Sequence, residues 1–138
     1  MGAWYTIGLC LGLGLGVGVI LAGLLGSTTL GASAAALAAT AVGAIAGLLI
    51  GDTAETIGGG VAGFLGAVSA AAVVYGALRR GATRLGIAAY LGMAGFALCL
   101  VALIPLAGYL EVIGAPLLAA RMRGRQAARF AGLRTLAK

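Results

Sequence analysis

The sequence predicts an all-α integral membrane protein with four transmembrane helices plus a short fifth or re-entrant helix, tightly packed through small-residue (Gly/Ala) faces. Hydrophobic residues make up 62% of the 138-residue chain, only 9% of the residues are charged, and histidine is absent. Soluble domains carry about 25% charged residues, so a water-soluble fold of this size could not cover its surface. Apolar stretches near the roughly 20 residues needed to cross the hydrocarbon recur along the chain.

The first three apolar segments are expected at residues 3–26, 30–50 and 57–78. Trp4 and Tyr5 open the first segment, where amphipathic rings suit the level of the lipid head groups. Short polar breaks at residues 27–29 and 51–56 separate the segments, and a basic loop at residues 79–84 follows the third. Each segment is long enough for one crossing.

The last apolar stretch, residues 85–120, must bend or turn. As one straight helix it would extend about 54 Å, nearly twice the hydrocarbon thickness. Pro105 removes a backbone donor, so we expect a fourth span at residues 85–104 and a shorter helix at residues 108–120. The organisation is then a polytopic transmembrane domain at residues 1–120 and a basic amphipathic tail at residues 121–138 that lies at the membrane surface.

The charges predict an orientation. Nine bases against three acids give a net charge of +6, and the bases cluster in residues 79–84 and in the tail. Lys and Arg in short loops tend to stay cytoplasmic, so we expect a multi-pass protein of a bacterial plasma (inner) membrane with a cytoplasmic C-terminus. Residues 85–120 then cross twice or dip and return. A four-span chain with both termini inside is the alternative, but it leaves three arginines outside.

Glycine spacing predicts close helix packing. In lipid, helices associate through van der Waals contact, and glycine or alanine every fourth residue lets two backbones approach. The same spacing does not tell whether the facing helix belongs to this chain or to another. The run 58–60 in the third segment could also break that helix, as in discontinuous transporter helices. The helix-packing candidates are Gly8, Gly12, Gly16, Gly43, Gly47, Gly59 and Gly63.

The three acids are the candidates for an ion or proton site, since ionisable groups in or beside a span are functional by default. Asp52 and Glu55 are three residues apart and would share a helical face. They would otherwise cap the third span, with Asp52 or Thr53 accepting from free N–H groups. Glu111 could receive a hydrogen bond from Tyr109, or could mark the point where the chain leaves the membrane.

Several chemistries are excluded by composition. Without histidine there is no Ser-His-Asp triad, and zinc hydrolysis lacks its ligands. Cys10 and Cys99 lie apart inside apolar runs and are expected as small buried residues. We therefore expect no enzyme, no metal and no cofactor. The bases flank membrane segments, which argues against nucleic acid, and the candidates for lipid head-group or partner contact are Arg121, Arg123, Arg125 and Arg129.

Three functions stay open at this point. The first is an accessory or scaffold subunit that packs against other membrane helices, because small-residue faces are abundant and polar groups inside the spans are few. The alternative is a small homo-oligomeric channel or carrier with outer-face acids that select cations. A third is a membrane module for a soluble domain that another chain supplies. Membrane lipid and other transmembrane helices are the expected partners.

Overall fold

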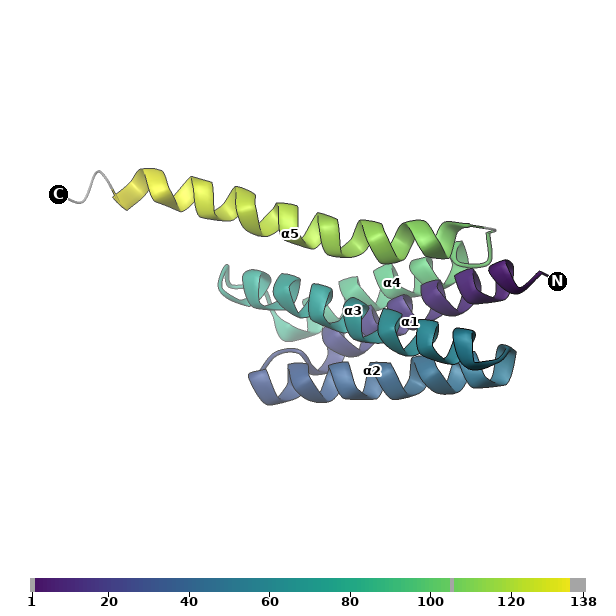
Figure 1. The fold of residues 1–138 in the computed structure, drawn as a ribbon. Helices are drawn as coiled ribbons and strands as arrows, with labels where there is room; N and C mark the ends of the chain where they lie inside the picture. The colour runs from purple at the N-terminus through teal and green to yellow at the C-terminus, as the bar shows by residue number, and fades with distance from the viewer. Residues whose placement is uncertain (1, 105, 135–138) are drawn as a thin grey trace.

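A computed structural model describes residues 2–104 and 106–134, with side-chain surroundings for the described residues up to 122. It contains five helices, and the described residues form no strand (Figure 1). Four of them are long and apolar enough to cross a membrane. The predicted all-α class with four candidate spans is thereby confirmed. The helices are α1 (Ala3–Leu25), α2 (Thr29–Ile50), α3 (Thr53–Leu78), α4 (Arg84–Val101) and α5 (Ala107–Arg134).

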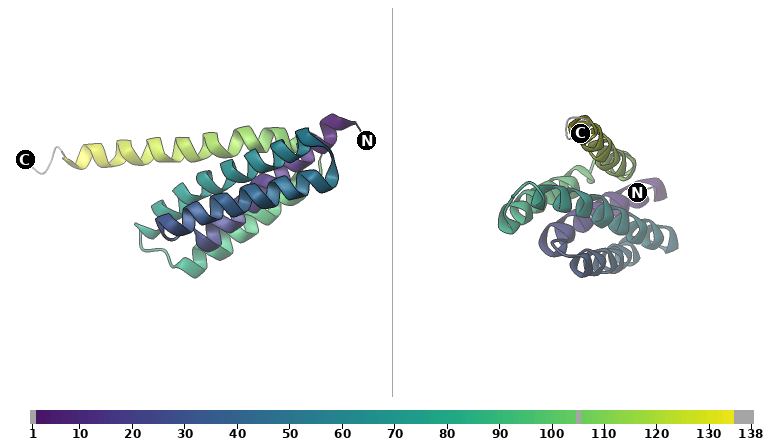
Figure 2. Two further views of the ribbon diagram at one scale, coloured as in Figure 1. Left: turned by 60° about the horizontal axis from the view of Figure 1, so that its bottom comes forward. Right: turned by 90° about the vertical axis from the view of Figure 1, so that its left-hand side faces the viewer.

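Successive helices run in opposite directions, and α1 occupies the centre of the bundle. It contacts all four other helices, whereas α4 packs mainly against α1 and only weakly against α3 and α5. Seen end-on, α2 and α5 lie on opposite sides of α1 (Figure 2). The first half of α5 packs against α1 and α3, and its second half extends past the end of the bundle (Figure 1).

The turns between helices are built from short local contacts. The Thr28 side chain accepts a hydrogen bond from the Gly31 N–H at 3.0 Å and so caps α2. Thr83 caps α4 in the same way, accepting from the Gly86 N–H at 3.2 Å. Such caps satisfy N–H groups that a helix start leaves free. Gly81 has φ +84° in the basic loop, a conformation that glycine adopts without steric cost.

The fifth helix differs from the prediction. The chain forms one continuous helix from Ala107 to Arg134 through Pro116, not a short helix at 108–120 with a separate surface tail. An internal proline removes one backbone hydrogen bond and crowds the preceding turn, but membrane helices tolerate it when local adjustments satisfy the freed carbonyl. The change from apolar to basic composition near residue 120 therefore marks no helix end, and the expected boundary at 120/121 falls inside α5. Pro105, the expected turn, lies outside the described residues.

The break that the glycine run 58–60 could have caused in the third segment is not present. The helix α3 runs without interruption from Thr53 to Leu78 and includes all three glycines of the run 58–60. Two of these glycines are held against other helices, since Gly59 lies on the Gly43 carbonyl and Gly60 near Ala44. Packing of this kind compensates for the low helix propensity of glycine. The run is a contact surface within a regular helix.

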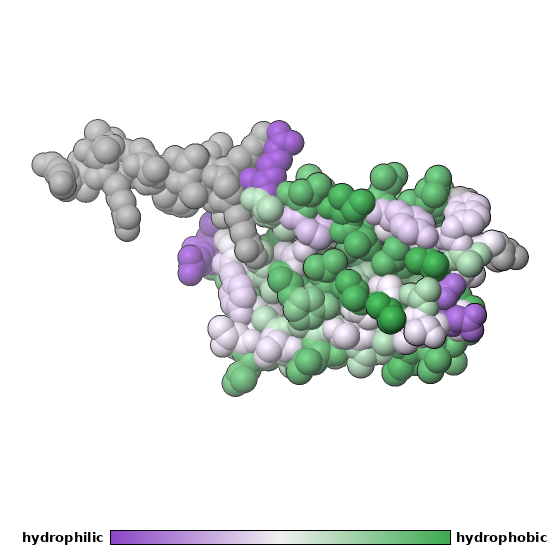
Figure 3. Space-filling model, in the orientation of Figure 1, coloured by the Kyte–Doolittle hydropathy of each residue, from purple (hydrophilic) through white to green (hydrophobic). Residues whose placement is uncertain are grey.

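The distribution of side chains is the reverse of that in a soluble bundle. Most buried positions hold glycine or alanine, while leucines such as Leu30 and Leu85, each 82% exposed, point outward. Figure 3 shows hydrophobic surface along the side of the bundle and hydrophilic surface mainly toward its two ends. Hydrocarbon is as apolar as leucine, so large outward side chains cost nothing in a bilayer.

Backbone contacts join α3 to both α1 and α2. A Cβ atom at Gly14 would overlap the Gly59 carbonyl, and one at Gly18 would overlap the Gly63 carbonyl. From the opposite side, a Cβ atom at Gly43 would meet the same Gly59 carbonyl. No side chain fits between the helices at these points unless a backbone moves.

The contact at Gly14 gives the first prediction. Gly14→Ala places a methyl group on the Gly59 carbonyl and should lower the free energy of unfolding by about 1–3 kcal/mol, the usual cost of overpacking. The matched control is Gly92→Ala in α4, because a Cβ atom there meets nothing within 4 Å. It should be neutral or slightly stabilising, since alanine favours helix over glycine. Unfolding in mixed detergent, followed by circular dichroism, measures both variants, and equal stability would contradict the contact.

Candidate functional site at the acidic end of the bundle

The charged residues separate to the two ends of the bundle. The N-terminus, the α2–α3 turn with Asp52 and the α4–α5 turn lie at one end, the acidic end. The α1–α2 turn and the basic loop lie at the other, the basic end, toward which α5 runs (Figure 1). This is the arrangement in which residues 85–120 pass through the bundle and return.

Glu55 joins α1 to the start of α3. Its Oε2 accepts a hydrogen bond from the Asp52 N–H at 3.0 Å, completing a capping box at the N-terminus of α3. The Thr6 hydroxyl lies 2.6 Å from Glu55 Oε1. The same hydroxyl is 2.9 Å from the Ala3 carbonyl, but its single proton favours the shorter, charge-assisted bond to the carboxylate. Glu55 is 5% exposed with both oxygens engaged, while Asp52 is exposed.

Glu111 lies on α5 in contact with α1 and α4. Both of its carboxyl oxygens are buried, and neither has a hydrogen-bond partner among the described residues. A Cβ atom at Gly12 would lie 2.7 Å from Glu111 Oε2, so the carboxyl group sits on the bare α1 backbone, next to Ala102. The expected bond from Tyr109 is not made, because that hydroxyl donates to the Trp4 carbonyl at 2.7 Å. Helix residues two apart do not face each other.

The structure does not bring the three acids together. Glu55 contacts α1 at Thr6 and Glu111 contacts it at Gly12, six residues later. Six residues correspond to about 9 Å along the axis and to different faces of α1. In the part of the chain that the structure describes, no group of three His, Cys, Asp or Glu residues is placed to hold a metal ion. Glu55 caps the N-terminus of α3, which was the structural alternative to an ion site. Glu111 lies apart from both other acids.

The two cysteines are free thiols on different helices. Cys10 is buried, and the Cys99 Sγ lies 3.9 Å from the Leu13 carbonyl. No disulfide joins them. Neither thiol has the neighbours of a metal site or of an activated nucleophile.

The helix-packing candidates all lie against a neighbouring helix. Gly8, Gly12 and Gly16 face α5 and α4, whereas Gly43 and Gly47 of α2 meet the carbonyls of Gly59 and Glu55, and Gly63 meets that of Ala39. Among the lipid or partner candidates, Arg121 is exposed on α5. The side chains of Arg123, Arg125 and Arg129 lie outside the described residues.

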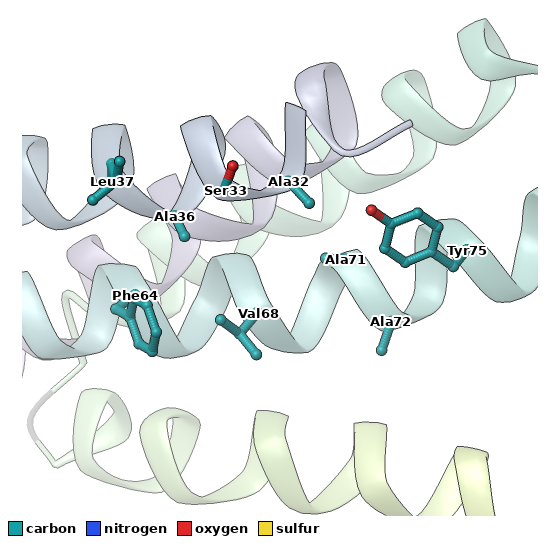
Figure 4. Close-up of a pocket in the computed structure, with 9 residues that line it drawn as sticks. All are labelled: Ala32, Ser33, Ala36, Leu37, Phe64, Val68, Ala71, Ala72 and Tyr75. Atoms are coloured by element: carbon teal, nitrogen blue, oxygen red, sulfur yellow. The ribbon is translucent and has the colours of Figure 1, made fainter. Parts of the chain in front are cut away.

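A lateral groove between α2 and α3 was not predicted from the sequence. It has a volume of about 520 Å³ and opens on the side of the bundle (Figure 4). Alanines from both helices line it between Phe64 and Tyr75. The four-residue spacing of Ala32 and Ala36 on α2 could have indicated a helix-contact face. It does not tell which helix lies opposite that face. The groove is lined by Ala32, Ser33, Ala36, Leu37, Phe64, Val68, Ala71, Ala72 and Tyr75.

The fold and the distribution of polar groups define a class, the multi-pass helical membrane proteins. Four apolar helices, an outward-facing hydrophobic surface and charges at the two ends support that assignment. No protein-family model, curated protein or solved structure matches the chain.

The Glu55 contact gives the second prediction. Thr6→Val removes the hydroxyl and leaves a buried carboxylate oxygen without its donor, which costs about 1–3 kcal/mol of unfolding free energy. The control is Thr56→Val, because the Thr56 hydroxyl donates only within its own turn, to the Asp52 carbonyl at 2.9 Å. This control should change stability less than Thr6→Val does, because Thr56 is only partly buried and its loss leaves no buried carboxylate oxygen without a donor. Equal losses in detergent unfolding would show that the Thr6 bond contributes nothing specific.

Proposed function

We propose that the protein is an accessory membrane subunit that receives a transmembrane helix of a larger partner in the groove between α2 and α3. The observation that supports the proposal is that the centre of the bundle is tightly packed, whereas an open groove lies on its outer surface. The central helix α1 contacts all four neighbours, and its glycines meet the α3 backbone directly. The large open volume lies on the outside of the bundle.

The dimensions and lining of the groove suit a helix. From Phe64 to Tyr75 it follows twelve residues of α3, about 16 Å or three helical turns. Its alanines leave room for a second backbone to approach, and close approach is the main source of helix association in lipid. The Ser33 hydroxyl donates to the Leu30 carbonyl and keeps lone pairs free for an interhelical bond. Tyr75 supplies a second hydroxyl in the groove.

The channel or carrier alternative has weaker support. A cation site needs several oxygen ligands around one ion, whereas Glu55 and Glu111 engage different faces of α1. Within one chain, the backbone contacts of α1 with α3 leave no passage along the axis where they occur. No feature of the described residues specifically favours flux over packing.

Orientation follows from the charges. We propose that the basic end faces the cytoplasm of a bacterial cell, because Arg79, Arg80 and Arg84 are exposed together in one short connection. The basic second half of α5 runs toward the same side. Anionic lipid head groups or an acidic partner surface at that face would each be attracted by these arginines.

The groove gives the third prediction. Ala72→Trp fills the groove from α3 and should abolish recovery of the partner, while the bundle itself keeps its helix content. Ala89→Trp is the matched control, since Ala89 is exposed on α4 and does not line the groove. Native mass spectrometry after gentle release from the cell's own membrane measures the complexes.

Three outcomes can be distinguished. Loss of a larger partner in Ala72→Trp alone, with a photo-crosslink from Leu37 to a transmembrane segment of that partner, supports the proposal. Recovery of wild-type protein only as a homogeneous homo-oligomer contradicts it and favours the channel or carrier. Recovery as a monomer with phospholipid retained through the groove assigns the groove to lipid and also contradicts it.

Topology gives the fourth prediction. In a variant without native cysteines, Ala82→Cys in the basic loop should resist a membrane-impermeant maleimide on intact cells. Thr53→Cys, at the start of α3, should react, because it lies exposed at the acidic end. Permeabilised cells provide the control for reactivity at both sites. Labelling of Ala82→Cys in intact cells would reverse the proposed orientation.

A further inference from the structure

Glu111 is the one side chain of the described residues whose buried oxygens lack any partner. It is not a flexible acid that reaches solvent, since both oxygens are enclosed between α5, α1 and α4. The α1 surface beneath it is glycine backbone, whose N–H groups and carbonyls are used within the helix. An ionised carboxylate in such a place pays the full cost of desolvation without compensation.

The residues around Glu111 favour a proton over a metal cation as the ligand of its carboxyl group. A calcium or magnesium ion requires about six oxygen ligands, and among the described residues no second carboxylate joins Glu111 in a group of His, Cys, Asp or Glu residues that could hold a metal ion. A bound proton requires no further ligand, because it forms a covalent O–H bond and removes the charge. The geometry therefore points to a proton, not to a metal cation.

We propose that Glu111 is an internal proton-binding site, and that its protonated form is the one in which α5 lies on α1. The balance is simple: the carboxylate and one proton from water give the neutral carboxylic acid. When the proton leaves, the negative charge on Glu111 has no partner against the Gly12 backbone. The charged form is then stabilised only if α5 shifts and admits water, so proton release is coupled to undocking of α5.

The other titratable groups do not compete for this role. Only the Cys99 thiol of α4 lies close to Glu111. On α1, the Tyr5 hydroxyl donates to the Leu103 carbonyl at 3.1 Å, and Cys10 lies beside Glu55. On α5, Tyr109 donates to the Trp4 carbonyl, and Arg121 is exposed ten residues after Glu111.

The remaining groups of α3 and α4 are also accounted for. Glu55 is engaged by Thr6 and Asp52. Tyr75 lines the groove on the α2 side, Tyr90 is exposed on α4, and Arg84 belongs to the basic loop at the far end. No described cation faces Glu111, so no ion pair would stabilise its charged form.

Infrared spectroscopy of the whole protein in lipid vesicles tests the proposal. At neutral pH the wild type should show the C=O band of a protonated carboxyl group. Glu111→Gln should lose that band, because the amide is isosteric but cannot ionise. Glu55→Gln is the matched control and should retain it, since the Glu55 carboxylate already has two donors. The absence of the band in wild type, or its persistence in Glu111→Gln, would overturn the site.

The coupling between proton release and undocking of α5 is tested by the pH dependence of thermal stability. If the native state holds a proton that the unfolded chain releases, wild-type thermal stability should fall as pH rises above the range of an ordinary glutamic acid. Glu111→Gln should remove that part of the pH dependence, and Glu55→Gln should not. Identical pH profiles for wild type and Glu111→Gln would disprove the coupling. If Glu111→Gln does not fold, a carbodiimide specific for protonated carboxyl groups should modify Glu111 and not Glu55 in wild type, and the reverse pattern would refute the site.

Discussion

Contact between the backbones of α1 and α3 is the constraint on which the rest of the structure depends. Water is absent from the hydrocarbon, so helices there gain little from burying apolar surface and must gain from close packing. The carbonyls of Gly59 and Gly63 take the space where side chains of Gly14 and Gly18 would lie. Once these two helices are in contact, α2 can reach the same carbonyl of Gly59 from the other side. The bundle thus grows around α3 as much as around α1.

This constraint also decides where large side chains and open space occur. Because the contact surfaces are largely glycine and alanine, many of the large apolar side chains face outward, as Leu30 and Phe64 do. Among the described residues, the glycine contacts close the space between α1 and α3, and the larger cavities lie between α2 and α3, beside Phe64 and Tyr75, and between α3 and α4, beside Tyr90. A protein built in this way is suited to contact other membrane components through its sides. That consequence of packing underlies the proposed accessory role.

Much of the fold could be predicted because its signals are local. The first three spans follow from runs of hydropathy, and Thr28 and Thr83 mark helix starts by cap chemistry that is visible in the sequence. The course of α5 could not be predicted in the same way. The change from apolar to basic residues after residue 120 suggested a helix end, but the structure shows a continuous helix from Ala107 to Arg134. The lateral groove was missed because its walls come from two helices whose mutual rotation no single segment encodes.

The candidate acids show the same division between local and tertiary information. Asp52 and Glu55 form a capping box whose three-residue spacing is present in the sequence. Glu111 has an equally suggestive position beside Tyr109, yet the structure turns the tyrosine toward Trp4 and the acid toward Gly12. The two glutamates therefore differ in the number of hydrogen-bond donors that face each carboxyl group. Glu55 has two and is a structural anion, whereas Glu111 has none in the described structure and must be neutral wherever α5 rests on α1. A glycine backbone that permits close helix contact has no side chain to offer a buried charge, so the feature that holds this bundle together also makes the charge state of Glu111 a condition of α5 docking.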